Sequence, residues 1–343
     1  MYRLVGSVRK YDWGDTAFIP SLLNETPDGS PCAELWFGTH LMGPSLAETP
    51  TGNVALKEIV GDLDILVKIL AASRPLSLQT HPTREQAQTG FDEENARGVP
   101  LESPLRIYRD TADKPELIVA LTPFHALCGF APIDTSVVLL HAMEWHREAE
   151  YLEQHGLRPY LEWVYANDLT VSFTNAPTWL AELAQLYPND HSLRVAPLLH
   201  HVELAPGEAL SLPAGNLHAY LFGAGLEVMT SSDNVVRAGF TSKHVDVPEL
   251  LRIVDAQPLD EPVVRPIIDG NIGTYPCPTD AFSVQRIELT DSYILSPSPV
   301  HRIVLATNGS TDSLPIGRAA VVLPNEQVEF RGTATLWVCA GRV

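Results

Sequence analysis

The chain has 343 residues, of which 45% are hydrophobic and 19% charged, and its formal net charge at pH 7 is −19. This composition is that of a globular protein with a large core and excludes intrinsic disorder. The strong negative charge argues against nucleic acid or an anionic membrane surface as a partner.

The first residues of the chain lack the apolar core of a signal peptide, and no apolar run reaches the roughly 18 residues that a spanning helix needs. The four cysteines are far apart and have no CxxC spacing. We therefore expect reduced thiols, a cytoplasmic location and no membrane partner.

Short strands and turns are expected over residues 1–130. Residues 33–38 and 64–70 have the pattern of strands, and the second of them carries Lys68 inside an apolar run. Residues 76–81 alternate apolar and polar side chains, so Ser77, Gln79 and His81 share one face of a strand. A segment at 83–104 has partly helical composition, and residues 114–130 read as a buried strand, a turn and a second strand.

The pattern changes to helical between Ile133 and about Arg194. The stretch 134–136 can cap a helix that continues through 137–140, and residues 148–155 and 177–186 are amphipathic. Strands return after Leu198. They are expected at 201–204, 209–212, 218–222, 225–229, 235–240, 282–289, 301–307, 319–323 and 334–340.

These elements predict a mainly β fold with an α-helical insert. The predicted units are a first β domain of residues 1–130 and 198–256, which carries the candidate site residues given below, a helical insert of residues 131–197 and a C-terminal β domain of residues 257–343. Many short strands at close spacing are typical of a sandwich or a barrel.

Four side chains could hold a metal ion. Gln79 and His81 point the same way, and Glu116 heads an apolar strand where an unpaired carboxylate is costly. The stretch 207–218 has the spacing G-x5-P-x-G-x2-H, which delivers His218 onto a strand and resembles the second metal motif of cupin barrels. Nitrogen and oxygen ligands without a thiolate suit Zn²⁺ best, with Co²⁺, Mn²⁺ and Fe²⁺ as alternatives.

A second set of side chains is cationic. Lys114 lies two residues from Glu116, and Arg237 and Lys243 follow within one later stretch. In a chain with few basic residues, three of them beside the metal segments predict an anion pocket, to which Ser77 can add a hydroxyl.

Several motifs in the same order resemble those of type I phosphomannose isomerases, zinc enzymes of the cupin superfamily. The resemblance is strong over residues 1–130 and 198–255, loose over the insert and weak over the C-terminal third. The motifs are Tyr11-Asp12-Trp13-Gly14, Ala33-Glu34-Leu35-Trp36, Leu76-Ser77-Leu78-Gln79-Thr80-His81-Pro82, Lys114-Pro115-Glu116-Leu117, Leu121-Thr122-Pro123-Phe124, residues 214–221, residues 232–239 and residues 243–250.

The resemblance implies jelly-roll β-barrel domains of the cupin type and one Zn²⁺ per chain. It implies that the enzyme interconverts mannose 6-phosphate and fructose 6-phosphate through an enediol(ate). The implied oligomeric state is a monomer, and the implied partner is the sugar phosphate. The implied metal ligands are Gln79, His81, Glu116 and His218, the implied catalytic residue is Arg237, and the implied substrate-binding residues are Ser77, Lys114, Glu227 and Lys243. The general base is left open between Glu227, a lysine and a zinc-bound water.

Two other readings remain at this point: a cupin isomerase of another sugar phosphate, and a non-catalytic sugar- or metal-binding cupin. A cupin oxygenase is disfavoured because Gln79-Thr80-His81 replaces the His-x-His pair typical of those sites. His200 and His201 are not expected to share a metal ion, since adjacent strand residues face opposite ways.

Overall fold

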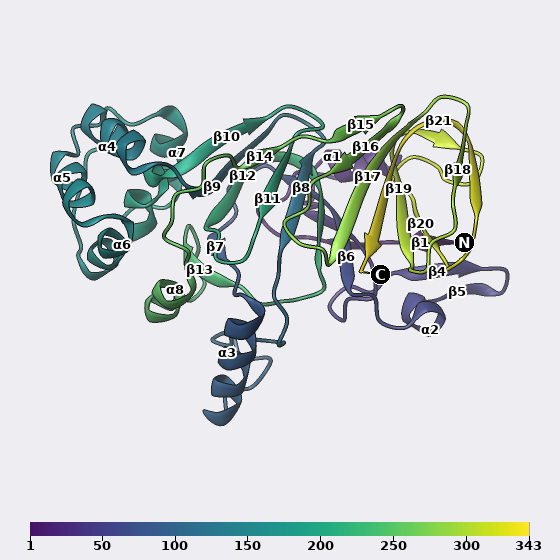
Figure 1. The fold of residues 1–343 in the computed structure, drawn as a ribbon, viewed down its shortest axis with the longest axis horizontal. Coiled ribbons are helices and arrows are strands. Elements are labelled where there is room, and N and C mark those ends of the chain that lie inside the picture. The colour runs from purple at the N-terminus through teal and green to yellow at the C-terminus, as the bar shows by residue number, and fades with distance from the viewer. Residues whose placement is uncertain (343) are drawn as a thin grey trace.

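The computed structural model describes residues 1–342, which form two large antiparallel sheets and a group of helices at one end (Figure 1). The first sheet comprises β2 (Ser7–Arg9), β3 (Glu34–Phe37), β6 (Ile65–Ala72), β7 (Leu78–Thr80), β8 (Glu116–Ala120), β9 (Phe124–Phe130), β10 (Leu199–Leu204), β11 (Ala209–Leu212), β12 (His218–Thr230), β13 (Val236–Gly239) and β14 (Val263–Val264). The mainly β architecture with a helical insert is thereby confirmed.

The second sheet combines strands from both ends of the chain. It comprises β1 (Tyr2–Val5), β4 (Leu46–Thr49), β5 (Gly52–Ala55), β15 (Ile267–Asp269), β16 (Ile272–Tyr275), β17 (Phe282–Leu289), β18 (Ser292–Leu295), β19 (Arg302–Thr311), β20 (Ala319–Val322) and β21 (Val328–Gly341). Because β1 pairs with β20, the N-terminal segment contributes to the C-terminal sheet, and both termini lie at this end of the molecule (Figure 1).

Strand pairing within residues 1–342 leaves both sheets open, so the expected closed barrels are not formed. The first sheet branches at β12 and ends at β2, β14, β10 and β13, of which β2 and β14 are only three and two residues long. Strands this short offer few backbone groups for further pairing, which is a common way to end a sheet.

A shared apolar core joins the two sheets face to face. Leu35, Val67 and Leu226 of the first sheet pack in one cluster with Ile303 and Trp337 of the second. Burial of this apolar surface fixes the position of the first sheet against the second.

The helical elements are α1 (Phe18–Leu22), α2 (Leu56–Val60), α3 (Arg84–Ala96), α4 (Ile133–Ala142), α5 (His146–His155), α6 (Leu157–Ala166), α7 (Thr178–Leu186), α8 (Val247–Ile253) and the 3₁₀ turns η1 (His191–Arg194) and η2 (Ala196–Leu198). Helices α4 to α7 gather at one end of the first sheet (Figure 1), where Leu140 and Tyr160 share a core with Leu127 of β9. None of the helices in residues 1–342 has both the length and the apolarity to span a membrane.

The predicted start of the first helix of the insert is wrong. Helix α4 begins at Ile133, before the predicted cap at 134–136, because the Ser136 amide already donates to the carbonyl of Pro132. Helix α6 lies within the predicted helical region but was given no bounds of its own. Pro159 lies in the first turn of α6, where a missing amide hydrogen costs no internal hydrogen bond.

Strand β12 replaces the two strands predicted at 218–222 and 225–229. Its first half pairs with β7 and β9, and its second half pairs with β6 and β8. The pairing with β9 is irregular between Tyr220 and Phe222, and Gly223 follows with φ +109°. A side chain at Gly223 would come within 2.5 Å of the Pro123 carbonyl, so glycine allows the strand to bend and continue.

Candidate metal centre and active site

A cavity of about 860 Å³ opens over one face of the first sheet. Among the residues that line it are Ser77, Gln79, Lys114, Glu116, Glu227, Arg237 and Lys243, all of them predicted site residues. The structure thus brings together side chains that lie up to 166 positions apart in the chain.

The cavity is organised by a row of residues that are paired across three strands. Gln79 of β7 lies opposite His218 of β12 on one side and opposite Arg237 of β13 on the other. Residues that are paired across neighbouring strands point to the same face of a sheet. The backbone pairing therefore directs an amide, an imidazole and a guanidinium to one surface.

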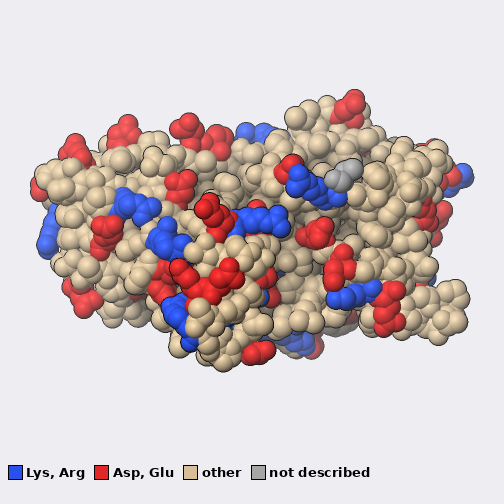
Figure 2. Space-filling view, turned by 60° about the horizontal axis from the view of Figure 1, so that its bottom comes forward, with Lys and Arg blue, Asp and Glu red and all other residues tan. Residues whose placement is uncertain are grey.

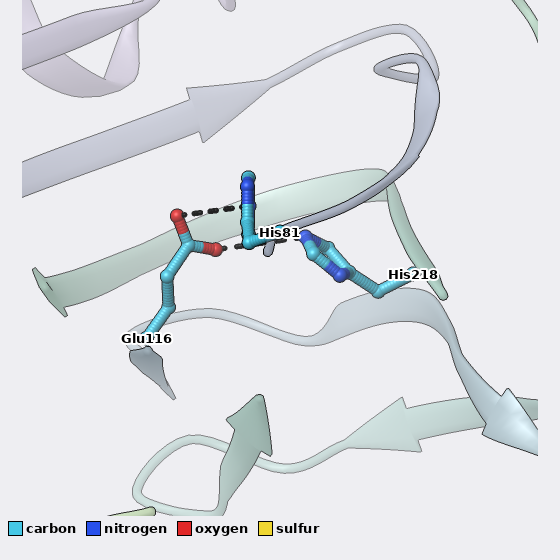
Figure 3. Close-up of side chains that lie close together, drawn as sticks. All are labelled: His81, Glu116 and His218. Carbon is cyan, nitrogen blue, oxygen red and sulfur yellow. Dashed lines mark ion pairs between the residues drawn. The ribbon is translucent and has the colours of Figure 1, made fainter. Parts of the chain in front are cut away.

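His81, Glu116 and His218 converge (Figure 3), and Glu116 joins this cluster to the lining of the cavity. Nε2 of His81 lies 3.4 Å from one Glu116 carboxylate oxygen, and Nε2 of His218 lies 3.5 Å from the other. All three side chains are buried. One ligand atom from each lies within 4.8 Å of the other two, which is close enough for all three to bind one ion after small adjustments.

Backbone carbonyls fix the orientation of both imidazoles. Nδ1 of His81 lies 2.8 Å from the Asn234 carbonyl oxygen, and Nδ1 of His218 lies 3.1 Å from that of Asn216. A carbonyl only accepts, so each Nδ1 carries the hydrogen and each Nε2 presents its lone pair toward Glu116. Carbonyl partners of this kind are typical of metal-binding histidines.

The charge states in the cluster are those that a metal ligand requires. Burial and the nearby Lys114 lower the pKa of His81 to about 4, so its ring is neutral near pH 7. Burial opposes ionisation of Glu116, but Lys114 and the histidines outweigh it and hold the pKa of this carboxyl well below its usual range. Neutral imidazole and ionised carboxylate are the forms that bind divalent cations.

The same atoms lack other partners. Nε2 of His81, Nε2 of His218 and Oε2 of Glu116 are shielded from solvent and have no hydrogen-bond partner in residues 1–342. Buried polar atoms are almost always satisfied, so this set fits a cation. Gln79 lies next to it, and its side-chain oxygen accepts a hydrogen bond from the Ser77 hydroxyl at 3.2 Å.

The predicted cations occupy two positions in the cavity. Lys114 is buried, and its ammonium lies 2.9 Å from Glu116 Oε1. Arg237 and Lys243 lie nearer the opening, where the pKa of each is lowered by burial and by Arg109, and that of Lys243 also by Arg237. Three cations this close repel one another, which favours binding of an anion among them.

A buried charge network on the floor of the cavity was missed by the sequence analysis. Lys68 lies opposite Glu227 in the sheet, with 2.8 Å between ammonium and carboxylate, and 3.8 Å from Glu34. The Tyr220 hydroxyl donates to Glu227 at 2.9 Å, and Trp36 donates to Glu34 at 2.9 Å. A lysine within the fully buried strand β6 was the available signal, because such a lysine needs carboxylate partners.

Residues 1–133 match the family model "Phosphomannose isomerase type I, catalytic domain". The mannose-6-phosphate isomerase of Shigella flexneri is 35% identical to this chain over 332 residues, covering 85% of this chain and 84% of the relative. That of Escherichia coli strain K12 is 34% identical over 331 residues, with the same coverage.

Solved structures agree with these relatives. The apo form of mannose 6-phosphate isomerase from Salmonella typhimurium superposes with a TM-score of 0.88 at 30% identity, covering 100% of this chain and 99% of that one. A zinc-bound mannose 6-phosphate isomerase has a TM-score of 0.85 at the same identity and coverage. The predicted family resemblance and the cupin-type fold are confirmed, and the chain belongs to the type I phosphomannose isomerases.

Proposed function

We propose that this chain is a zinc-dependent aldose–ketose isomerase that interconverts mannose 6-phosphate and fructose 6-phosphate. The observation that carries the proposal is the buried convergence of His81, Glu116 and His218 on a cavity that also holds Arg237 and Lys243. The activity named for the Shigella and Escherichia relatives, and the zinc in the solved relative, support it.

One Zn²⁺ per chain would be held by Gln79, His81, Glu116 and His218. The unpartnered imidazole nitrogens and carboxylate oxygen support three of these ligands, and the pairing of Gln79 with His218 supports the fourth. When bound, the ion supplies Lewis acidity toward the carbonyl and hydroxyl oxygens of the sugar. The Ser77 hydroxyl orients the Gln79 amide through its hydrogen bond.

Arg237 is the proposed catalytic cation. The isomerisation moves a proton between C2 and C1 and develops negative charge on the oxygens of an enediol(ate). The β13 strand presents the Arg237 guanidinium on the face that carries Gln79, so its positive charge is in place before the reaction starts. A fixed charge stabilises such an oxyanion without reorganisation of the site.

The other cations divide between the two ends of the substrate. Lys243 lies at the exposed end of the cavity beside Arg237, and we assign it to the phosphate. Lys114 lies against Glu116 at the inner end, and we assign it to the sugar oxygens near that carboxylate.

Glu227 is assigned a positioning role rather than that of the general base. Its two oxygens accept hydrogen bonds from Lys68 and the Tyr220 hydroxyl, which weakens a carboxylate as a proton acceptor. In return, Glu227 holds the Lys68 ammonium at the floor of the cavity, among its lining residues. Glu227 itself also lines the cavity, so its predicted contact with the substrate stays part of the proposal beside its contact with Lys68.

The predicted domains, oligomeric state and location of the protein complete the proposal. We propose that the helices between residues 131 and 197 form a unit attached to the catalytic sheet, and that the enzyme is a cytoplasmic monomer acting on a small substrate alone. Basic side chains on the face shown in Figure 2 lie interspersed with acidic ones, which is in keeping with a small-molecule partner.

A coupled assay that follows fructose 6-phosphate formation from mannose 6-phosphate tests the proposal. We expect turnover that is lost on dialysis against a metal chelator and restored by about one equivalent of Zn²⁺ per chain. Turnover that is unchanged after the zinc has been removed, or turnover of another aldose phosphate with none of mannose 6-phosphate, would contradict it.

A further inference from the structure

A second group of metal-binding side chains lies on strands β9 and β10, apart from the catalytic cluster. His125 of β9 lies directly opposite Glu203 of β10, and His201 precedes Glu203 by two residues. All three side chains therefore point to the same face of the strand pair. One ligand atom from each lies within 4.8 Å of the other two, the same limit that the catalytic cluster meets.

The group opens into its own pocket. This pocket has a volume of about 490 Å³, and His125 and His201 line it together with Trp179 and Phe222. None of the residues assigned above to zinc or substrate belongs to its lining. The two cavities share only a wall that includes Arg74.

His201 resembles the catalytic histidines in two respects. Its Nε2 is shielded from solvent and has no hydrogen-bond partner in the described part of the chain, as is true of His81 and His218. Burial lowers its pKa, so the ring is neutral and able to bind a cation. Neighbouring His200, by contrast, is satisfied, with Nε2 2.6 Å from the Leu259 carbonyl oxygen.

Aromatic packing fixes the two imidazoles in place. The Trp179 ring of α7 stacks on His201 at 4.8 Å between centroids and 5° between planes. Phe222 of β12 packs edge-on against His125 at 6.2 Å. Rings held in this way lose little conformational freedom when they bind an ion, and the exposed Glu203 carboxylate can adjust to it.

We propose that His125, His201 and Glu203 form a second site for a divalent first-row transition-metal ion, Zn²⁺ foremost. Two imidazole nitrogens and one carboxylate oxygen form the donor set that Zn²⁺ takes in three-ligand sites with an open position. The site is more exposed than the catalytic one, since the His125 and Glu203 side chains are 36% and 69% exposed. It is therefore the weaker of the two sites and exchanges its ion with solvent.

Equilibrium dialysis of the untagged enzyme against Zn²⁺, with metal measured per chain, tests this site. We expect two equivalents in the natural chain and one in the double variant His125→Gln/Glu203→Gln. Each single variant should weaken the second equivalent by about 10-fold or more. These two side chains are partly exposed, so their replacement leaves the core intact. Unchanged turnover of the double variant at one equivalent of zinc will show that its catalytic site still binds zinc.

The matched control is His200→Gln, the adjacent histidine that faces the other way and is bound to a carbonyl. It should keep both equivalents. A natural chain that binds one equivalent only would overturn the proposal. So would a second equivalent that persists in the double variant, since that ion would belong elsewhere, such as at the exposed pair His141 and His146.

Discussion

The two sheets share one apolar core but differ in the charges that they bury. Counting acidic, basic and histidine side chains, the strands of the first sheet bury five, namely Glu34, Lys68, Glu116, His218 and Glu227. In the second sheet, the strands within residues 1–342 bury one, Arg302, and its guanidinium donates to the backbone carbonyls of Ser296 and Glu326.

This difference separates the part of the molecule that performs chemistry from the part that supports it. Burying a charge removes its hydration, and a buried ion pair often contributes no net stability. The first sheet therefore carries groups that stability alone would not select, and all five face or adjoin the catalytic cavity. The second sheet supplies apolar surface, against which the first is held rigid.

The largest effect is expected where the metal cluster is broken. His218→Ala should lose bound zinc and reduce turnover by about 1000-fold, well beyond the 10–100-fold typical of residues that only orient a ligand. Zinc per chain and kcat, measured on the same sample, test this. Thr274→Ala, an exposed change on the second sheet, should retain both. Full zinc content and normal kcat in His218→Ala would remove His218 from the ligand set.

The buried charge network should show the next largest effect. Lys68→Met leaves Glu34 and Glu227 buried without their cation, which should lower the free energy of unfolding by about 3–5 kcal/mol near pH 8. Burial raises the pKa of Glu34 and Lys68 opposes this, so without Lys68 the loss should be smaller at pH 5, where the Glu34 carboxyl is protonated more readily. Urea unfolding at the two pH values measures this. An equal loss at both would show that the carboxylates do not depend on Lys68.

Acid should lower the stability of the metal-free protein through the groups of the metal cluster. The folded pKa of His81 is about 4, below the 6.5 of a free imidazole. Between these values the unfolded chain binds the extra proton, so stability falls as pH drops from 6.5 to 4, by on the order of 3 kcal/mol. Glu116, with its lowered pKa, acts in the same direction below about pH 4.5. Thermal unfolding of the metal-free protein should show the decline, and His81→Gln should flatten it.

The smallest effect on turnover is expected from a substitution in the part of the core that the second sheet contributes. Leu305 is fully buried between the sheets, and Leu305→Ala should lower the free energy of unfolding by about 2–5 kcal/mol. At a temperature where the variant remains folded, kcat should stay within about twofold, since no charged group of the cavity moves. A tenfold loss of kcat would show that the second sheet does more than support the first.

Local patterns in the sequence were sufficient to predict many elements and the candidate ligands. Strands β11 and β17 have the predicted bounds, because apolar runs between turn residues define a strand locally. The four ligand positions followed from the alternation around Gln79, the apolar strand after Glu116 and the turn before His218. The structure places His81, Glu116 and His218 together, as this pattern predicts.

Features that depend on distant parts of the chain could not be predicted. Lys68 and Glu227 are 159 positions apart, and only the pairing of β6 with β12 makes them neighbours. The group around His125 depends in the same way on the pairing of β9 with β10. No local pattern encodes which strand lies beside which, since strand order is decided by tertiary packing.

The irregularity in β12 has a consequence for the spacing of the site along the chain. His218 and Glu227 are nine residues apart, an odd number, so in a regular strand they would occupy opposite faces. The extra residue between Tyr220 and Phe222 changes this parity and lets one strand serve the metal cluster and the charge network on the same side. Deleting Leu221 would leave the two residues eight apart, an even number, so a strand without the irregularity would still keep both on the same side.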